Sequence, residues 1–285
     1  MILLADGGST KIEWNVVDNG KVLKKIFTKG ANPFFRTSEE ISSELTKMLV
    51  PELEGYAICT VYFYGAGCIN AEKCDVIRSA VELSLGKLPV EVGSDLLGAA
   101  KSLCGDNAGI ACILGTGSNS CFYDGKEIVE NVSPLGYILG DEGSGAVLGR
   151  LFLGDCLKNQ FGKEMRDELL TELGLTPAEI LEKVYREDLP NRFLAQLTPF
   201  IKQHLEHYKV HELVQKSFED FFRKNVMQYE CKKCDVYFTG SIAYHFQEVL
   251  FQAAEKFDIK IKSICQSPMD GLIRHYSQKR KETAL

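Results

Sequence analysis

The sequence predicts an α/β fold built from one module that occurs twice. A turn rich in glycine and hydroxyl residues follows an apolar run at 7–10, and a similar turn follows another apolar run at 115–118. Each turn is followed by a hairpin signal, Asn-Gly at 19–20 and Asp-Gly at 124–125. The same order of strands and helices then continues after both. We therefore expect two α/β domains of related topology.

The first module begins with "ILLADGGSTKIEWNVVDNGKVLKKIFT". This stretch predicts a strand, a Gly-Gly-Ser-Thr turn, a strand, an Asn-Gly turn and a third strand. From Thr60, "TVYFYGAGCINAEKCDVIRSAVELSL" predicts a strand, a Gly-Ala-Gly turn and a helix. The strand "PVEVGSD" and the small-residue helix "LLGAAKSL" complete the module.

The second module repeats these elements. "GIACILGTGSNSCFYDGKEIVE" at 109–130 predicts a strand, a Gly-Thr-Gly-Ser turn, a strand, an Asp-Gly turn and a strand. From Asp235, "DVYFTGSIAYHFQEVLFQAAEKF" predicts a strand, a Thr-Gly-Ser turn and a helix, and "IKIKSIC" and "MDGLIRHY" predict a last strand and helix. Coincidence is the alternative, and the repetition of four elements in one order argues against it.

A long helical region interrupts the second module at about residues 144–231, where apolar residues recur at three- and four-residue steps. Within it, Thr176 before Pro177 and Glu179 predicts a helix start. Helices that cover a sheet are the simplest interpretation of this region. The predicted domains are residues 1–105 together with 270–285, and residues 106–269 with the helical insertion.

Composition excludes several partner classes. The 285 residues carry 33 basic and 39 acidic side chains, and a net charge of −6 argues against a nucleic-acid surface. No apolar run reaches the roughly 18 residues of a membrane span. The N-terminal "MILLADGGST" lacks the basic segment and cleavage site of a secretory signal. We therefore expect a cytoplasmic protein.

The ten cysteines are scattered over predicted strands, helices and loops. In a chain that can bury a large core, we expect them to be reduced thiols rather than a disulfide framework. Cys231 and Cys234 form one Cys-x-x-Cys pair, which could be a redox or metal pair. No second pair stands at the spacing of a structural zinc site.

Both glycine-rich turns have the chemistry of phosphate sites. Backbone N–H groups, hydroxyls and an ammonium group are the usual partners of a phosphate. Surface turns rich in Gly and Ser are common, so one turn alone is weak support. Two such turns, one from each module, suit two domains that hold the phosphates of a nucleotide and close around a substrate.

In this order and spacing, five motifs resemble the actin-like ATPase superfamily of sugar kinases, heat-shock ATPases and actin. Within it, the chain most resembles the N-acetylglucosamine kinase-like branch, which shares a sequence family with the ATPase activators of benzoyl-CoA reductase and 2-hydroxyacyl-CoA dehydratase. The resemblance covers nearly the whole chain and implies duplicated ribonuclease H-like domains with an interdomain cleft. The motifs are "DGGSTK" (6–11, first phosphate), "GSDLLGAA" (93–100, catalytic aspartate), "ILGTGSNS" (113–120, second phosphate), "GDEGSG" (140–145, sugar-kinase loop) and "FTGSIA" (238–243, adenosine).

The resemblance implies ATP and Mg²⁺ as cofactors and a role for each motif residue. Asp95 would be the general base that takes a proton from the 6-hydroxyl of the sugar, and Asp6 would bind Mg²⁺ through water. The implied ATP and phosphate contacts are Gly7, Gly8, Ser9, Thr10, Lys11, Gly115, Thr116, Gly117, Ser118, Gly240 and Ser241. The implied sugar contacts are Asn32, Asp95, Thr116, Gly136 and Asp141. These types suit the chemistry, because an attacking hydroxyl needs a positioned carboxylate and the phosphates need charge neutralisation.

Each of these residues also has a purely structural interpretation. Asp95 could cap the helix that follows it. Asp141 could belong to a solvated turn, and Asn32 could be a turn residue before a proline. Lys11 could point to solvent.

Three functions are consistent with the sequence. The first is ATP-dependent phosphorylation of an amino sugar, most simply N-acetylglucosamine to its 6-phosphate, by an enzyme that could be a homodimer. The second is an ATPase activator that holds an iron–sulfur cluster between subunits, for which Cys121 and Cys156 are the first cysteines to test. The third is a nucleotide-binding scaffold. The Asp95 motif and the "GDEGSG" loop favour the kinase, but the sequence leaves open which sugar it uses.

Overall fold

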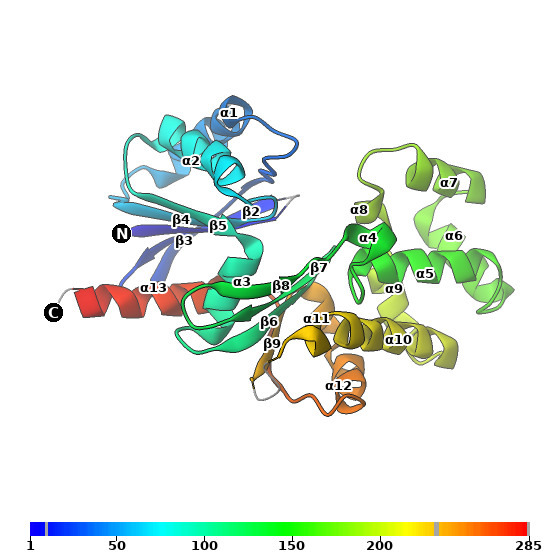
Figure 1. Cartoon of the computed structure of the whole chain (residues 1–285). Helices are drawn as coiled ribbons and strands as arrows, with labels where there is room; N and C mark the ends of the chain where they lie inside the picture. The colour runs from blue at the N-terminus through cyan, green and yellow to red at the C-terminus, as the bar shows by residue number, and fades with distance from the viewer. Residues whose placement is uncertain (9–10, 231–233, 284–285) are drawn as a thin grey trace. The chain divides into compact units, whose positions relative to one another are not determined.

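The computed structural model describes residues 1–8, 11–230 and 234–283, with side chains described as far as residue 278. Two compact units divide the chain between them (Figure 1). Unit 1 comprises Met1–Asn107, Asp124–Ile128 and Pro268–Leu285, and unit 2 comprises Ala108–Tyr123 and Val129–Ser267.

Unit 1 contains a five-stranded sheet in the order β3-β2-β1-β4-β5. The strands are β1 (Ile2–Gly7), β2 (Lys11–Asp18), β3 (Lys21–Lys29), β4 (Thr60–Gly65) and β5 (Val90–Ser94). The helices are α1 (Ser38–Met48), the short 3₁₀ helix η1 (Val50–Leu53), α2 (Ala71–Leu85), α3 (Asp95–Cys104) and α13 (Met269–Thr283). β1 runs antiparallel to β2 and parallel to β4, and β4 runs parallel to β5.

Side chains of β1 alternate between two separate apolar layers, as the period of a strand requires. Leu3 and Ala5 join the layer that contains Ile41 of α1 and Ile77 of α2. Ile2 and Leu4 join the opposite layer, which contains residues of α13. Helices α1 and α2 therefore cover one face of the sheet, and the C-terminal α13 covers the other (Figure 1).

Unit 2 repeats this sheet with the order β10-β9-β6-β7-β8. Its strands are β6 (Gly109–Leu114), β7 (Ser118–Tyr123), β8 (Ile128–Val132), β9 (Val236–Thr239) and β10 (Ile261–Cys265). The central β6 pairs antiparallel with β7 and parallel with β9, as β1 does with β2 and β4. The predicted fold class is confirmed: two mixed five-stranded sheets with helices repeat one topology.

The helices of unit 2 build one large apolar core around the sheet. Those before β9 are α4 (Gly136–Leu139), α5 (Gly145–Leu157), α6 (Lys163–Leu173), α7 (Pro177–Tyr185), α8 (Pro190–Ala195), α9 (Thr198–Gln203), α10 (Tyr208–Lys224) and the 3₁₀ helix η2 (Val226–Gln228). Those after β9 are α11 (Ser241–His245) and α12 (Gln247–Glu255). The predicted start of α7 is confirmed, because Thr176 and Glu179 form a reciprocal capping box.

The cysteines only partly follow the prediction. Eight of the described cysteines form no disulfide bond, as expected. Cys234 is disulfide-bonded, which contradicts the expectation of reduced thiols throughout. Spacing alone could not decide this, because a disulfide depends on how the backbone places the two sulfur atoms. Cys231 lies outside the described residues.

In the part of the chain that the structure describes, no helix combines the length and apolar character needed to cross a bilayer.

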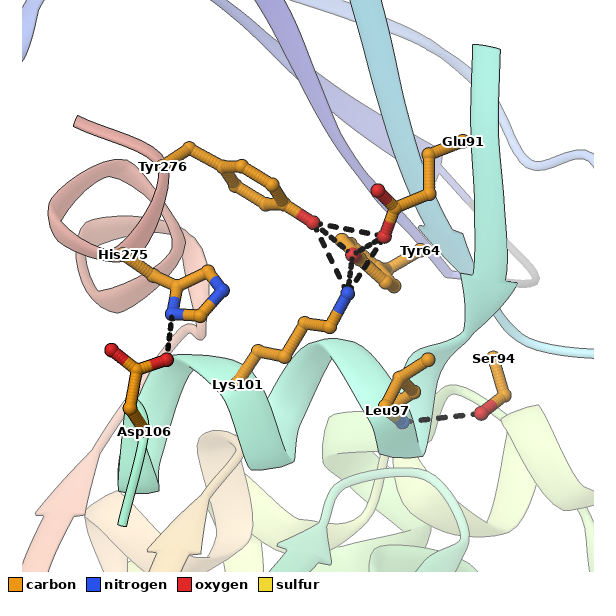
Figure 2. Close-up of polar contacts among 8 residues, drawn as sticks. All are labelled: Tyr64, Glu91, Ser94, Leu97, Lys101, Asp106, His275 and Tyr276. Atoms are coloured by element: carbon orange, nitrogen blue, oxygen red, sulfur yellow. Dashed lines mark hydrogen bonds and ion pairs between the residues drawn. The ribbon is translucent and has the colours of Figure 1, made fainter. Parts of the chain in front are cut away.

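A polar cluster of four side chains joins α13 to the rest of unit 1 (Figure 2). The Nζ of Lys101 donates to Glu91 Oε1 at 2.7 Å and to the Tyr64 hydroxyl at 2.8 Å. The hydroxyl of Tyr276, from α13, donates to the same carboxylate at 3.0 Å and hydrogen-bonds the Tyr64 hydroxyl. Burial alone would raise the pKa of Glu91, but hydrogen bonds from Lys101, Tyr64 and Tyr276 outweigh it and lower that pKa.

We expect Lys101→Met to lower the free energy of unfolding of unit 1 by about 1–2 kcal/mol, because two buried hydroxyls and a carboxylate lose their cationic partner. The single tryptophan, Trp14, is fully buried in unit 1, so urea unfolding followed by its fluorescence reports on this unit. Lys29→Met is the matched control, since the 79% exposed Lys29 side chain makes only a 3.8 Å ion pair. Equal losses in both variants would contradict a stabilising role for the cluster.

Candidate active site

The turn between β1 and β2 begins at two glycines. A Cβ on Gly7 would lie 2.7 Å from the Phe63 ring, so only glycine fits there without displacing that ring. The N–H of Gly8 donates to the carbonyl of Lys11 at 3.0 Å, which closes the hairpin. Lys11 is exposed, and its Nζ lies 4.8 Å from the centre of the Phe27 ring. Ser9 and Thr10, predicted phosphate contacts, lie outside the described residues.

Asp6 precedes this turn on β1, opposite Glu13 of β2. Burial is the main cause that raises its pKa to about 7, and the negative charges of Asp95 and Glu13 raise it further. The charge of Lys11 acts in the opposite direction. Asp6 thus lies within electrostatic reach of two other acidic groups, which is an environment that a bound cation would relieve.

Asp95 is the first residue of α3, and the helix cap is its neighbour (Figure 2). The side chain of Ser94 accepts the N–H of Leu97 at 3.1 Å. The Oδ1 of Asp95 accepts the N–H of Leu96 at 2.8 Å. Burial raises the pKa of Asp95, although the hydrogen bond from Leu96 counteracts it. Ser94 is therefore the N-cap of α3, and Asp95 at the first helical position adds one hydrogen bond to the first turn.

Asn32 lies in the turn that follows β3. Its Oδ1 accepts the N–H of Phe34, and its carbonyl accepts the N–H of Phe35, both at 3.0 Å. Asn32 is therefore a turn residue, as the structural interpretation expected. This role fixes the direction of the carboxamide, which is a requirement for a specific contact with a ligand.

In unit 2, the turn between β6 and β7 is supported by the start of α5. The N–H of Gly145 donates to the carbonyl of Gly115 at 2.8 Å, and the N–H of Ala146 donates to that of Thr116 at 3.0 Å. The side chain of Thr116 is exposed at the tip of the turn. Two backbone hydrogen bonds thus connect the predicted second phosphate motif to the start of α5, where the predicted sugar-kinase loop ends.

Asp141 packs directly against this turn. Its Oδ1 accepts the N–H of Ser118 at 3.3 Å, and a Cβ on Gly117 would lie 3.1 Å from its Oδ2. The backbone of Asp141 is left-handed, with a φ of 52°, a conformation that is uncommon for residues other than glycine. Burial raises its pKa to about 6. A partly buried carboxyl group on a residue with a strained backbone is a frequent feature of functional sites.

The other predicted residues of unit 2 lie in different surroundings. Gly136 begins α4 and is exposed, in a loop closed by a hydrogen bond from the N–H of Asp141 to the carbonyl of Pro134. Gly240 has a φ of 114°, and its backbone packs against the carbonyl of Leu114. Ser241 begins α11 and is exposed. Gly240 and Ser241 therefore lie beside the end of β6, where the 115–117 turn begins.

Comparison with known proteins identifies the family. A candidate N-acetylglucosamine kinase from Porphyromonas gingivalis is 48% identical, with a TM-score of 0.95 over 98% of this chain and 100% of that one. The chain belongs to the N-acetylglucosamine kinase-like branch of the actin-like ATPase superfamily. The sequence matches no protein-family profile and no curated protein.

Two more distant structures share the fold of this N-acetylglucosamine kinase-like chain. A candidate N-acetylglucosamine kinase from Chromobacterium violaceum is 16% identical, with a TM-score of 0.71 over 96% of this chain and 99% of that one. The (R)-2-hydroxyglutaryl-CoA dehydratase component A from Acidaminococcus fermentans is 12% identical, with a TM-score of 0.51 over 100% and 99% of the two chains. At these identities the likeness concerns the fold alone.

The cysteines proposed for a cluster lie inside unit 2 of this N-acetylglucosamine kinase-like chain. Cys121 on β7 and Cys156 on α5 are both completely buried. Burial raises the pKa of Cys156 to about 11, which disfavours the thiolate that a cluster needs. These positions do not favour the activator function.

Sequence reasoning missed three residues that shape the site. Glu13 lies opposite Asp6, and only the register of β1 and β2 reveals this. Ser94 and Ser144 cap α3 and α5, the helices that begin beside Asp95 and Asp141. A serine before a small-residue helix is a recognisable start signal, so both caps could have been found from the sequence.

We expect Asp6→Asn to stabilise unit 1 increasingly as the pH rises from about 4 to about 7. Because the pKa of Asp6 is raised from its ordinary value of 3.8 to about 7 in the folded protein, protonated Asp6 contributes stability to the wild-type protein that is fully present below about pH 4 and is lost as the pH rises to about 7. Asparagine imitates the protonated form, and the difference should reach about 2–4 kcal/mol at neutral pH without Mg²⁺. Urea unfolding by Trp14 fluorescence measures it; a difference that does not change with pH would contradict the raised pKa.

Proposed function

We propose that this protein is an ATP-dependent amino-sugar kinase that converts N-acetylglucosamine to N-acetylglucosamine 6-phosphate. The observation that carries the proposal is the carboxyl group of Asp95. It lies at the first position of α3, its pKa is raised by burial, and the capping of the helix is performed by Ser94 instead. A carboxylate that is not the N-cap of its helix and is close enough to interact with Asp6 is suited to a chemical role.

In this proposal Asp95 is the general base. The Oδ1 of Asp95 is held by the N–H of Leu96, which fixes the orientation of the carboxyl group. The carboxylate accepts the proton of the sugar hydroxyl as that oxygen attacks the γ-phosphorus of ATP. A raised pKa increases the basicity of the carboxylate and so favours this proton transfer.

The acidic groups of unit 1 suit a hydrated Mg²⁺. Among the residues that the structure describes, no group of three or more His, Cys, Asp or Glu side chains could hold a metal directly. Asp6 would hold the hydrated ion, and its buried charge would be neutralised in return. When bound, Mg²⁺ neutralises charge on the phosphates of ATP. Lys11 would present an ammonium group to these phosphates, and Gly7 and Gly8 would line the same turn.

In unit 2, the turn at 115–118 would contact the phosphates of the nucleotide. Its shape is held by the hydrogen bonds from Gly145 and Ala146, so its backbone is already ordered before a ligand arrives. Thr116, exposed at the tip, adds a hydroxyl. Gly240 and Ser241, at the start of α11, would contact the nucleoside.

The sugar would be recognised by Asn32 and Thr116, by Asp95 through the reacting hydroxyl, and by Asp141, with Gly136 in the same loop as Asp141. A carboxylate accepts hydrogen bonds and a carboxamide both accepts and donates them, so together they can bind several hydroxyl groups at once. The P. gingivalis relative, at 48% identity, supports N-acetylglucosamine as the first acceptor to test.

We expect a coupled ADP-release assay over hexoses and N-acetylhexosamines to give the highest kcat/KM with N-acetylglucosamine. Asp95→Asn should lower kcat by about 10²–10⁴-fold with ATP binding nearly intact, which is the scale of a lost general base. Phosphorus NMR of the product identifies the phosphorylated oxygen. Absence of turnover with every sugar, or near-normal turnover by Asp95→Asn, would refute the proposal.

Ser94→Ala is the matched control for Asp95→Asn. Loss of the cap should destabilise the protein by about 1 kcal/mol, whereas Asp95→Asn should not destabilise it, because the raised pKa of Asp95 shows that its charged form is disfavoured in the folded protein. The two variants thus separate capping from chemistry. A melting temperature that falls more in Asp95→Asn than in Ser94→Ala would assign a structural role to Asp95.

We expect Asp141→Ala to raise the KM for the sugar by about 10–100-fold, or roughly 1.4–2.8 kcal/mol, and the KM for ATP much less. The reason is that a missing partner leaves a sugar hydroxyl unpaired in the complex. Because alanine is strained at a φ of 52°, Asp141→Asn is the companion variant, since asparagine tolerates this conformation. Parallel changes in both KM values, or an unchanged sugar KM, would remove Asp141 from the sugar site.

A further inference from the structure

We infer that the turn between β4 and α2, residues 65–70, orients Asn32 for the acceptor, and that Gly67 is the positioning residue in it. The inference deepens the proposed function and rests on it. Gly67 has a φ of 87°, and a Cβ at this position would lie 2.5 Å from Oδ1 of Asn32 and 3.0 Å from its Cγ. The turn therefore lies directly against the carboxamide, and only glycine permits this distance.

The Asn32 carboxamide is held from two directions. Its Oδ1 accepts the N–H of Phe34 at 3.0 Å, which anchors it to its own turn. Gly67 closes the other side, where Cδ of Pro33 would also lie 3.0 Å from an added Cβ. A methyl group at position 67 would therefore displace the carboxamide from the orientation that this hydrogen bond sets, or break the hydrogen bond.

The turn itself cannot easily move to absorb an added methyl group. At its start, Gly65 packs on the Phe63 ring, and the N–H of Ala66 donates to the carbonyl of Gly7 at 2.8 Å. At its end, the thiol of Cys74 hydrogen-bonds the carbonyl of Cys68 at 3.8 Å. Since both ends are fixed, the added methyl group would act mainly on Asn32.

The same turn also reaches the other groups of unit 1 that the proposed reaction uses. The bond from Ala66 ends on Gly7, in the predicted phosphate turn. The charge of Asp95 contributes to the raised pKa of Cys68, after burial and the neighbouring Cys74 thiol. Residues 65–70 therefore lie among Gly7, Asp95 and Asn32, and they set the position of the acceptor contact relative to the base.

Exposed apolar side chains surround this pair of turns. Phe35 is 74% exposed, Ile69 is 70% exposed and Phe34 is 51% exposed. Large apolar side chains gathered at one place on a surface are typical of a binding surface. The surface beside Asn32 thus has both a directed polar group and apolar groups, as a site for the face of a sugar ring requires.

The test compares three glycines of unit 1 that have similar positive φ values. Gly55 and Gly86 have φ values of 84° and 82°, close to that of Gly67, but a Cβ on either would meet nothing within 4 Å. Gly55→Ala and Gly86→Ala therefore place an alanine at a positive φ without the contact. We expect Gly67→Ala to raise the KM for N-acetylglucosamine by about 5–50-fold with the ATP KM within about twofold, and both controls to change neither by more than about twofold.

A double-mutant cycle with Asn32→Ser shows whether the effect passes through Asn32. In the Asn32→Ser background the carboxamide is gone, so Gly67→Ala should change the acceptor KM by less than about twofold. If Gly67→Ala alone does not fold, Asn32→Ser should restore folding by removing the clash. Effects that multiply independently, or a failure to restore folding, would overturn the inference.

A second readout does not depend on kinase activity. In protein labelled with ¹⁵N at asparagine, the carboxamide signal of Asn32, assigned by its loss in Asn32→Ser, should shift in Gly67→Ala and stay in place in both controls. If the wild-type protein phosphorylates no sugar, the proposed function fails while this measurement still decides the positioning. An unshifted Asn32 signal, or an acceptor KM in Gly67→Ala equal to that of the controls, would overturn it.

Discussion

Parallel pairing of β1, β4 and β5 is the constraint on which the candidate site of unit 1 depends. The register places Gly7 beside Gly65 and Gly65 beside Ser94, so three strands end at one edge of the sheet. Ligands of α/β proteins bind at the carboxyl ends of parallel strands for this reason. The positions of the predicted phosphate turn, the 65–70 turn and the start of α3 then follow from one hydrogen-bond pattern.

Unit 2 uses the same constraint with different side chains. β6 and β9 pair in parallel up to Ile113 and Thr239, so the 115–117 turn and the start of α11 leave the sheet side by side. What differs is the long helical insertion, whose first long helix, α5, donates hydrogen bonds to the turn. The duplicated topology therefore gives two similar sheets, and the segments inserted between their strands give each sheet different side chains at its candidate site.

In unit 1, burial of acidic side chains lowers the free energy of unfolding of the free protein. Asp6 is buried beside Asp95 and Glu13, and its charged form is disfavoured at neutral pH. Such an arrangement costs stability in the free protein, and sites of this kind persist where the strain serves binding or catalysis. The Tyr64–Glu91–Lys101–Tyr276 cluster is the opposite case, because its hydrogen bonds favour the charged carboxylate and attach α13 to the sheet.

The sequence by itself determined the fold class, because the signals for it are local. Apolar runs, the Asn-Gly and Asp-Gly turns and the Thr176 cap act over a few residues, and their repetition indicated two related sheets. Motif order also indicated the family. The site roles that it implied for Asp6, Asn32 and Asp141 remain predictions.

Only the tertiary structure decided the properties that depend on distant neighbours. The raised pKa of Asp6 requires burial and the charge of Asp95 from another strand end. The hydrogen bond between Tyr64 and Tyr276 joins residues 212 positions apart. The contact between Gly67 and Asn32 likewise joins two turns that no pattern connects. Periodicity and turn chemistry report on a residue and its immediate neighbours, whereas burial, charge coupling and close backbone approach arise only when separate segments pack together.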